Sequence, residues 1–248
     1  WAPDMVWAKD RTYAENHGLA DSLRGIALLT PDNTGAEAGD VTYLTSLDSD
    51  GFTVGSNNWI NRDTESHVAW NWLAGTAPTA DNSAGAGATP TAGSVKIDGS
   101  NLGSALAGTI AATRLSANTA SGFSIVSYSG NETTTQTVAH GLSSAPNMVI
   151  VKNLDYTTEW AVGSDEETSW SYYLYLNDSR GQTSASSVFG NAPDASVFKI
   201  GDATATNGAY DYIAYCFSSI EGYSKVGKYT GNVNADGTFA YLGFRPAM

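Results

Sequence analysis

A repeat within the chain constrains its architecture more than any other feature. Three short motifs occur twice, in the same order: APDMV at 2–6 and APNMV at 145–149, GFTVG at 51–55 and VFKIG at 197–201, HVAWNW at 67–72 and YIAYCF at 212–217. The two copies lie 143 residues apart (Pro3 to Pro146), 146 apart (Phe52 to Phe198) and 145 apart (Val68 to Ile213). This nearly constant spacing predicts tandem copies of one structural unit.

A third copy begins close to the end of the chain. GFSIV at 122–126 recurs as GYSKV at 222–226, and APNM at 145–148 recurs as RPAM at 245–248, each 100 residues later. The repeat therefore predicts three parts: a first unit over 1–74 that lacks its opening hairpin, a complete unit over 122–219, and the opening hairpin of a third copy over 220–248.

The two incomplete pieces together have about the length of one complete unit. Natural proteins usually cover or pair an open sheet edge. We therefore expect the C-terminal hairpin to supply the strands that the first unit lacks, either within the chain or on a neighbouring subunit. The alternative is that the sequence is an excerpt from a longer array, and its start at Trp1 fits an excerpt or a processed product.

Short β-branched and aromatic runs, such as MVIVK at 148–152, dominate the sequence and are separated by Gly, Asn, Asp and Pro. This pattern is typical of strands, and helical spacing of apolar residues is scarce. Residues 75–121 are rich in Gly, Ala and Thr, which predicts a flexible linker whose second half adds at most an edge strand or a short helix. The sequence predicts an all-β fold of two tandem β-sandwich units joined by this linker.

Charge and composition exclude several classes of protein. The 248 residues include 12 Lys and Arg against 25 Asp and Glu, a formal net charge of −13. Proteins that grip nucleic acid need a basic face, so this excess of acid argues against them. No apolar run reaches the roughly 18 residues of a membrane span. The single cysteine, Cys216, excludes an internal disulfide framework and a cysteine-built metal cluster.

The sequence contains no nucleotide-binding loop, nucleophile elbow or zinc-protease motif. Its three histidines, His17, His67 and His140, are not at metal-ligand spacing. Asp48 and Asp50 weakly resemble the start of a calcium loop, but the later ligands are missing. They are better interpreted as turn residues before the strand that begins at Gly51. We expect no cofactor and no enzymatic activity.

Aromatic residues are the remaining candidates for a site. Trp7, Trp70 and Trp72 fall on repeat-matched strand positions, which indicates core packing. Four others lie in polar, turn-rich segments, where they could anchor a protein interface or stack on a sugar ring. These four candidates for partner or carbohydrate contact are Trp59, Trp160, Trp170 and Tyr172.

The motifs also carry a resemblance. WAPDMVWAKDR at 1–11, followed by His17 and DSLRG at 21–25, resembles the opening of a repeat found in virion proteins of marine bacteriophages, cyanophages especially. GFSIVSYSGN at 122–131, YIAYCFSSIEGYSKVGKYTGN at 212–232 and the closing GFRPAM are similar to further parts of these proteins. The resemblance implies tandem lectin-like or jelly-roll-like β-sandwich units in a tail fibre, appendage or capsid decoration. It implies no catalytic residues.

Together, these features predict a non-enzymatic structural component on the exterior of a marine phage particle. Its partners would be further copies of itself or other virion proteins, with no nucleic acid and no membrane insertion. A carbohydrate-binding module that recognises glycans on the host surface is the alternative. A glycan depolymerase, which would need two opposed carboxylates, has no motif to support it.

Overall fold

A computed structural model describes residues 1–39, 42–167 and 169–246 of the chain. It confirms the all-β prediction, because within these residues the helical content is limited to two four-residue helices, α1 (Asn58–Asn61) and α2 (Thr204–Asn207). In the first unit, four strands form one sheet in the order β3-β2-β1-β6, and β4 pairs separately with β5. Their bounds are β1 Met5–Asp10, β2 Gly18–Asp21, β3 Gly25–Leu29, β4 Leu44–Asp48, β5 Gly51–Val54 and β6 His67–Trp72.

The rest of the chain builds a nine-stranded sheet in the order β15-β14-β13-β12-β17-β10-β9-β7-β8, and a two-stranded sheet of β11 and β16. Their bounds are β7 Val95–Ile97, β8 Ser100–Asn101, β9 Ala112–Asn118, β10 Phe123–Ser129, β11 Gln136–Ala139, β12 Met148–Asn153, β13 Ala161–Ser164, β14 Tyr172–Tyr175, β15 Thr183–Ser184, β16 Val197–Ile200 and β17 Asp211–Phe217. Neighbours in the nine-stranded sheet are antiparallel except β7 and β9.

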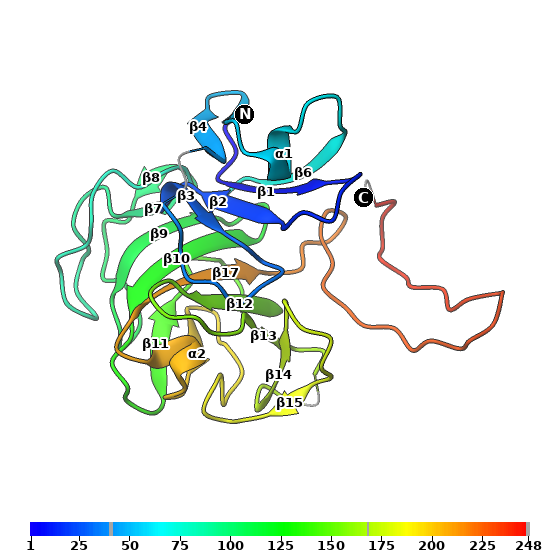
Figure 1. Ribbon diagram of the computed structural model, residues 1–248. Coiled ribbons are helices and arrows are strands. Elements are labelled where there is room, and N and C mark those ends of the chain that lie inside the picture. Colours follow the sequence, from blue (N-terminus) through cyan, green and yellow to red (C-terminus); the bar gives the residue numbers. More distant parts are fainter. Residues whose placement is uncertain (40–41, 168, 247–248) are drawn as a thin grey trace.

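Strand alternation distributes the apolar side chains over three separate cores. Along β1, Met5 packs into a core between the four-stranded and nine-stranded sheets, whereas Val6 faces the core beneath β4, β5 and α1. Along β17, Tyr215 faces the core between the sheets, and Cys216 faces the core beneath β11 and β16. The molecule is therefore a stack of layers in which the large sheets of the two units pack against each other (Figure 1).

The repeated motifs occupy equivalent strands. APDMV leads into β1 and APNMV into β12, GFTVG contains β5 and VFKIG contains β16, and the third motif forms β6 in one unit and β17 in the other. In both units the strand of the first motif is paired antiparallel with the strand of the third. The sequence repeat is thus a structural repeat.

A buried polar cluster joins the two units. The Tyr215 hydroxyl donates to Asp21 Oδ2 at 2.7 Å, and Arg24 Nε donates to the same oxygen at 2.7 Å. Burial alone would lower the pKa of Arg24, but the nearby Asp21, Tyr215 and Glu37 outweigh it, so the pKa is raised and the guanidinium stays charged. Burial also raises the pKa of Tyr215 well above its ordinary value. The cluster fixes one unit against the other, because each member satisfies a buried partner.

Residues 75–121 are not the flexible linker that their composition predicted. β9 is an inner strand of the nine-stranded sheet, paired with β10 on one side and β7 on the other, and its Leu115 and Ala117 are fully buried. The first half is a loop held by side-chain hydrogen bonds, such as those that Asn82 Oδ1 accepts from the N–H groups of Ala84 and Thr91. Small residues permit this loop to pack closely, and their low apolar content conceals that role in the sequence.

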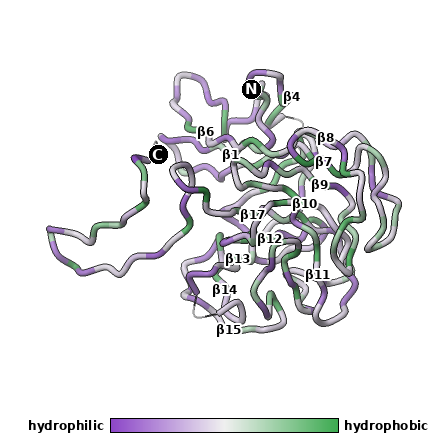
Figure 2. Tube along the Cα trace, turned by 180° about the vertical axis from the view of Figure 1, so that it is seen from behind, coloured by the Kyte–Doolittle hydropathy of each residue, from purple (hydrophilic) through white to green (hydrophobic). Residues whose placement is uncertain are grey.

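The predicted C-terminal hairpin is not formed within this chain. After an isolated bridge between Ile220 and Ser224, residues 225–246 contain no strand. Both views of the chain show this segment as a loop that projects from the layered body and then returns toward it (Figures 1 and 2). Pairing with the first unit inside the same chain is therefore not observed. Ala247 and Met248, which end the repeated motif, lie outside the described residues.

Candidate assembly surface

The first candidate feature is the open edge of β6. β6 pairs with β1 along its whole length and is the last strand of its sheet. Its counterpart β17 lies between β12 and β10 and pairs with both. The first unit thus lacks the strand that corresponds to β10, and the outer backbone groups of β6 have no ladder partner among the described residues. Such an edge is a template for another strand.

A hollow of about 550 Å³ lies beside this edge. Trp70 and Trp72 of β6 line one part of it, Phe123 and Phe217 of the nine-stranded sheet another. Trp72 packs against both phenylalanines, with ring centroids 6.3 Å and 6.4 Å apart. Trp72 therefore packs in the contact between the two units, and Trp70 and Trp72 together form an aromatic surface, the aromatic wall, beside the β6 edge.

β5 has a free edge as well. Its counterpart β16 pairs with β11, and Gly201 at the end of β16 donates its N–H to the Val188 carbonyl at 3.0 Å. In the first unit Gly55 donates its N–H to the Tyr43 carbonyl at 2.7 Å in the same way. Among the described residues, however, β5 pairs with β4 alone. The partner that corresponds to β11 is thus also missing, and both free edges match elements of the same opening hairpin.

The segment 225–246 exposes large apolar side chains. Val233 and Phe239 are 107% and 85% exposed, and Tyr229 and Tyr241 are 71% and 77% exposed. The start of the segment is held by hydrogen bonds: Val226 donates its N–H to Ser219 Oγ at 3.0 Å, and Lys228 Nζ donates to the Glu166 carbonyl at 2.8 Å. Near its other end, Leu242 and Phe244 are half-buried and line the hollow beside Trp70. Clustered exposed apolar residues usually mark a surface that binds a partner.

Family comparison gives a clear result. A family model described as a domain of unknown function (DUF7483) matches residues 1–97 and again residues 96–248. The chain belongs to the DUF7483 family. The two consecutive matches agree with the tandem units of the structure. Searches of curated proteins and of solved structures each returned no match.

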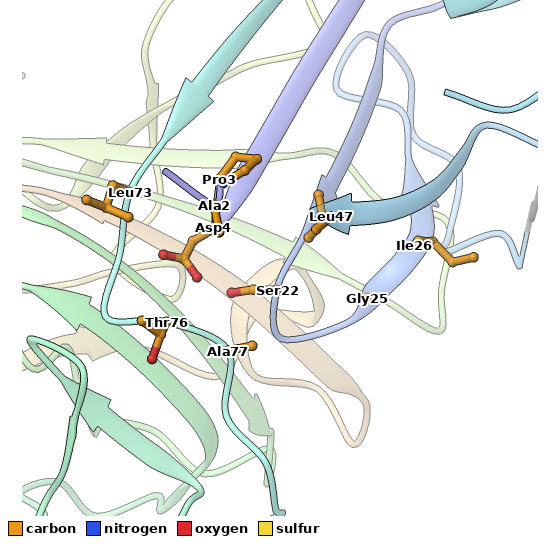
Figure 3. Close-up of a pocket in the computed structure, with 10 residues that line it drawn as sticks. All are labelled: Ala2, Pro3, Asp4, Ser22, Gly25, Ile26, Leu47, Leu73, Thr76 and Ala77. Carbon is orange, nitrogen blue, oxygen red and sulfur yellow. The ribbon is translucent and has the colours of Figure 1, made fainter. Parts of the chain in front are cut away.

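A second hollow of the DUF7483 chain, about 430 Å³ in volume, lies at the start of β1 (Figure 3). The oxygens of Asp4 and Ser22 point toward it, and the other walls, such as Pro3 and Leu47, are mainly apolar. Burial raises the pKa of Asp4, whose Oδ2 accepts a hydrogen bond from the Ala74 N–H at 2.8 Å. This carboxyl thus fixes the connection after β6, which is a structural task.

Two of the predicted contact residues are buried. Trp160 is fully buried, and its Nε1–H donates to the carbonyls of Thr30 and Asn33 at 3.2 Å and 3.1 Å. Trp170 is 6% exposed and donates its Nε1–H to Asp165 Oδ1 at 2.8 Å. Neither offers a ring face to a sugar or a partner, so the contact role predicted for them is wrong. The acceptor for Trp170 is a polar neighbour in the sequence, whereas the acceptors for Trp160 come from a loop of the first unit.

Trp59 and Tyr172 are half-buried. Trp59 packs against the core beneath β4, β5 and α1, and its backbone N–H is capped by Asn57 Oδ1 at 2.8 Å. Tyr172 begins β14 and pairs with Ser184 of the edge strand β15. The two lie in different units, so the structure does not bring the four aromatic candidates into one site.

Asp48 and Asp50 lie at the turn between β4 and β5, as predicted for turn residues. Asp48 Oδ2 accepts a hydrogen bond from Thr53 Oγ1 at 2.7 Å, and hydrogen bonds from Thr53 and Ser46 lower the pKa of Asp48. No group of three or more potential metal ligands comes together in the part of the chain that the structure describes. Over the same residues, no helix has the length and apolarity needed to cross a bilayer.

The histidines occupy separate structural positions. His17 Nδ1 accepts the Trp7 indole N–H at 2.9 Å, and burial lowers the pKa of His17. His140 is fully buried, its Nδ1 accepts the Leu142 N–H at 3.1 Å, and burial lowers its pKa too. Burial raises the pKa of the single thiol, Cys216, to about 12, which makes it a poor nucleophile.

Sequence reasoning assigned Trp70 and Trp72 to the core alone and so missed the aromatic wall beside β6. The signal was nevertheless present. The repeat finds no counterpart of 122–129 within residues 1–74, and a strand without that neighbour is an edge of its sheet. The contact between Asp21 and Tyr215, 194 residues apart in the chain, left no comparable signal.

Proposed function

We propose that this protein is a non-enzymatic structural component that assembles with copies of itself on the exterior of a marine phage particle. One observation carries the proposal. The same chain contains an unpaired sheet edge at β6 and an unpaired segment, 225–246, with exposed aromatic side chains. Both can be satisfied by association, because a strand added to a sheet edge pairs backbone groups on each partner.

The location on a particle rests on the sequence resemblance to phage virion proteins, and the charge supports it. A net charge of −13 opposes close packing of copies at low ionic strength, but salt screens charges beyond a few ångströms. At the ionic strength of seawater the Debye length is roughly 4 Å, between the values for 0.15 M and 1 M salt. An acidic particle surface is therefore tolerated in that medium.

The oligomeric state in solution tests the proposal. We expect light scattering coupled to size-exclusion chromatography, run in seawater-like salt, to show mass that increases with protein concentration, and negative-stain images to show regular assemblies. Lower salt should reduce the mass, because repulsion between acidic copies is less screened. A monomer at every concentration up to the millimolar range would contradict self-assembly. A monomer that binds host glycans on an array would instead support the carbohydrate-binding alternative.

A further inference from the structure

We propose that residues 223–229 of one copy add as a strand to the free edge of β6 in a second copy, and that residues 237–240 of the same donor add to the free edge of β5 in that second copy. The inference rests on the proposed self-assembly and specifies its contacts. It names one surface of the acceptor and one segment of the donor. Each copy carries both, so the contact can repeat from copy to copy.

The complete unit provides the register. β10 pairs antiparallel with β17, with Phe123 opposite Phe217, Ile125 opposite Tyr215 and Val126 opposite Ala214. The repeat places the motif of β6 145 residues before that of β17, and GYSKV 100 residues after GFSIV. Transferred to the first unit, this register puts Tyr223 opposite Trp72, Ser224 opposite Asn71, Lys225 opposite Trp70 and Val226 opposite Ala69.

The side chains brought together in this register fit each other. Lys225 would lie across the strand pair from Trp70, where an ammonium group and an indole face attract each other. The match continues beyond GYSKV, since YSGN at 128–131 recurs as YTGN at 229–232, with one extra residue in the later copy. Tyr128 stacks on Tyr212, with ring centroids 5.3 Å apart. Tyr229 would take the equivalent place beside His67.

The same template accounts for β5. β11 pairs antiparallel with β16, with Gln136 opposite Ile200 and Val138 opposite Phe198. After the extra residue the spacing is 101, so TVA at 137–139 recurs as TFA at 238–240. This places 237–240 at the position of β11 and Phe239 at the position of Val138, and Phe52 is the repeat counterpart of Phe198. Phe239, which is 85% exposed in the free chain, would lie at the β5 edge. Two free edges of the acceptor are thus matched by two parts of one donor segment.

A second copy fits better as the donor than the chain itself. Tyr223 and Trp72 line the same hollow, so pairing within the chain is in reach, yet no backbone hydrogen bond joins residues 225–246 to β6 in the described part of the chain. Lys225 also lines this hollow, but the hydrogen bonds that hold the start of the segment run to Ser219 and Glu166, which belong to the second unit. Donation between copies is head to tail, which produces rings or filaments.

Cysteine cross-linking in the 248-residue chain tests this register. Ala69→Cys and Val226→Cys are made in separate proteins, mixed and oxidised, because directly opposed residues of antiparallel strands have the Cα spacing that a disulfide requires. We expect a covalent dimer on a non-reducing gel. The matched control replaces Val226→Cys with Lys225→Cys, which faces the opposite side of the strand. It should give about tenfold less dimer, a ratio that reports a definite preference for one register.

A second pair of cysteine variants keeps the register testable if a variant of the first pair fails to fold. Asn71→Cys and Ser224→Cys are opposite each other in the same register, and Asn71 is exposed, so its replacement should leave the fold intact. Circular dichroism and thermal melts of every variant verify folding. Cys216 is present and buried in all proteins, and the oxidised wild type measures its background.

The outcomes distinguish a failure of the proposed register from a failure of self-assembly. Oligomers that give no more cross-link with Val226→Cys or Ser224→Cys than with the control would overturn the register and leave self-assembly standing. A monomer that forms no oligomer at all would overturn both. A chain with both Ala69→Cys and Val226→Cys that closes only an internal disulfide, with no dimer in the mixture of single variants, would show that the chain pairs with itself and would overturn donation between copies.

Discussion

β6 and β17 come from the same repeated motif, yet they occupy different environments. In β17, the five residues from Tyr212 to Cys216 are at most 1% exposed, because β12 and β10 flank the strand and packed layers cover both faces. In β6, five of the six residues are half-buried and Asn71 is exposed. The comparison shows that the motif determines the strand and its faces, and that the neighbours determine how deeply it is buried.

Lys9 and Lys152 show the same contrast at one position. Both belong to the first strand of their unit and align in the repeat. Lys152 is fully buried, and its Nζ donates to the carbonyls of Thr34 and Thr158 at 3.2 Å and 3.1 Å. Lys9 is half-buried, and its Nζ donates to the carbonyls of Asp10 and Tyr13. The loop of the first unit that contains Thr34 covers Lys152, whereas nothing equivalent covers Lys9.

Substitutions at Asp21 and at its repeat counterpart, Ser164, should show the largest difference in stability between the two units. Asp21→Ala should destabilise the protein by about 3–5 kcal/mol, since it leaves the buried Arg24 without one of its two carboxylate partners. Ser164→Ala should cost less than about 1 kcal/mol, because it removes one hydrogen bond from the Glu166 N–H. Urea unfolding measures both. Equal losses would contradict the assignment of Asp21 to the contact between units.

The next comparison exchanges residues between β17 and β6. Cys216→Asn should cost about 2–3 kcal/mol, because it places an amide in a fully buried apolar site. Asn71→Cys, at the equivalent exposed position, should change stability by no more than about 0.5 kcal/mol. The free energies of unfolding of both variants are compared with that of the wild type. A similar loss of stability at both sites would mean that another copy covers β6 in solution, as assembly predicts. Dilution should then remove the loss caused by Asn71→Cys.

The third comparison uses pH. Burial lowers the pKa of Lys152 from its ordinary 10.5 to about 8. Between these values the unfolded chain binds more protons at this residue than the folded chain, so its contribution to stability should increase as pH rises from 8. Lys152→Met should flatten that slope. Unfolding measured from pH 7.5 to 9.5, below the ordinary tyrosine range, checks this. Parallel slopes for Lys152→Met and wild type would contradict a buried Lys152.

The smallest effect is expected at His17, whose repeat counterpart is the buried Trp160. Burial lowers the pKa of His17 below 6.5, and its Nδ1 must be unprotonated to accept the Trp7 indole N–H. The unfolded chain therefore binds more protons near pH 6, and stability should fall as pH decreases below 6.5. His17→Gln should reduce this slope slightly, while Trp160→Phe should lower stability without changing the slope. Thermal melts between pH 5 and 7 test the pair.

Much of the fold could be predicted because it depends on local pattern. The runs at 123–128 and 148–152 became strands, and the repeated motifs became equivalent strands. The inner strand β9 was not foreseen, since ATRLSAN has few large apolar residues and relies on β10 and β7 for its burial. Trp160 and Trp170 were misplaced for a related reason. Their polar neighbours in the sequence resembled a surface, but Trp170 is buried against one such neighbour, Asp165, and Trp160 is buried beneath the distant loop that contains Thr30 and Asn33.

The candidate surface likewise has features that the sequence predicts and features that depend on the tertiary structure. The sequence alone established the repeat, the all-β composition, and the correspondence of 222–226 with 122–126, because these depend on residue order and side-chain periodicity. Only the tertiary structure decided that β6 and β5 carry the open edges, that residues 225–246 project unpaired, and that Tyr215 meets Asp21 and Arg24 between the units. Edges and burial are properties of neighbours in space, and those neighbours lie up to 194 residues apart in this chain.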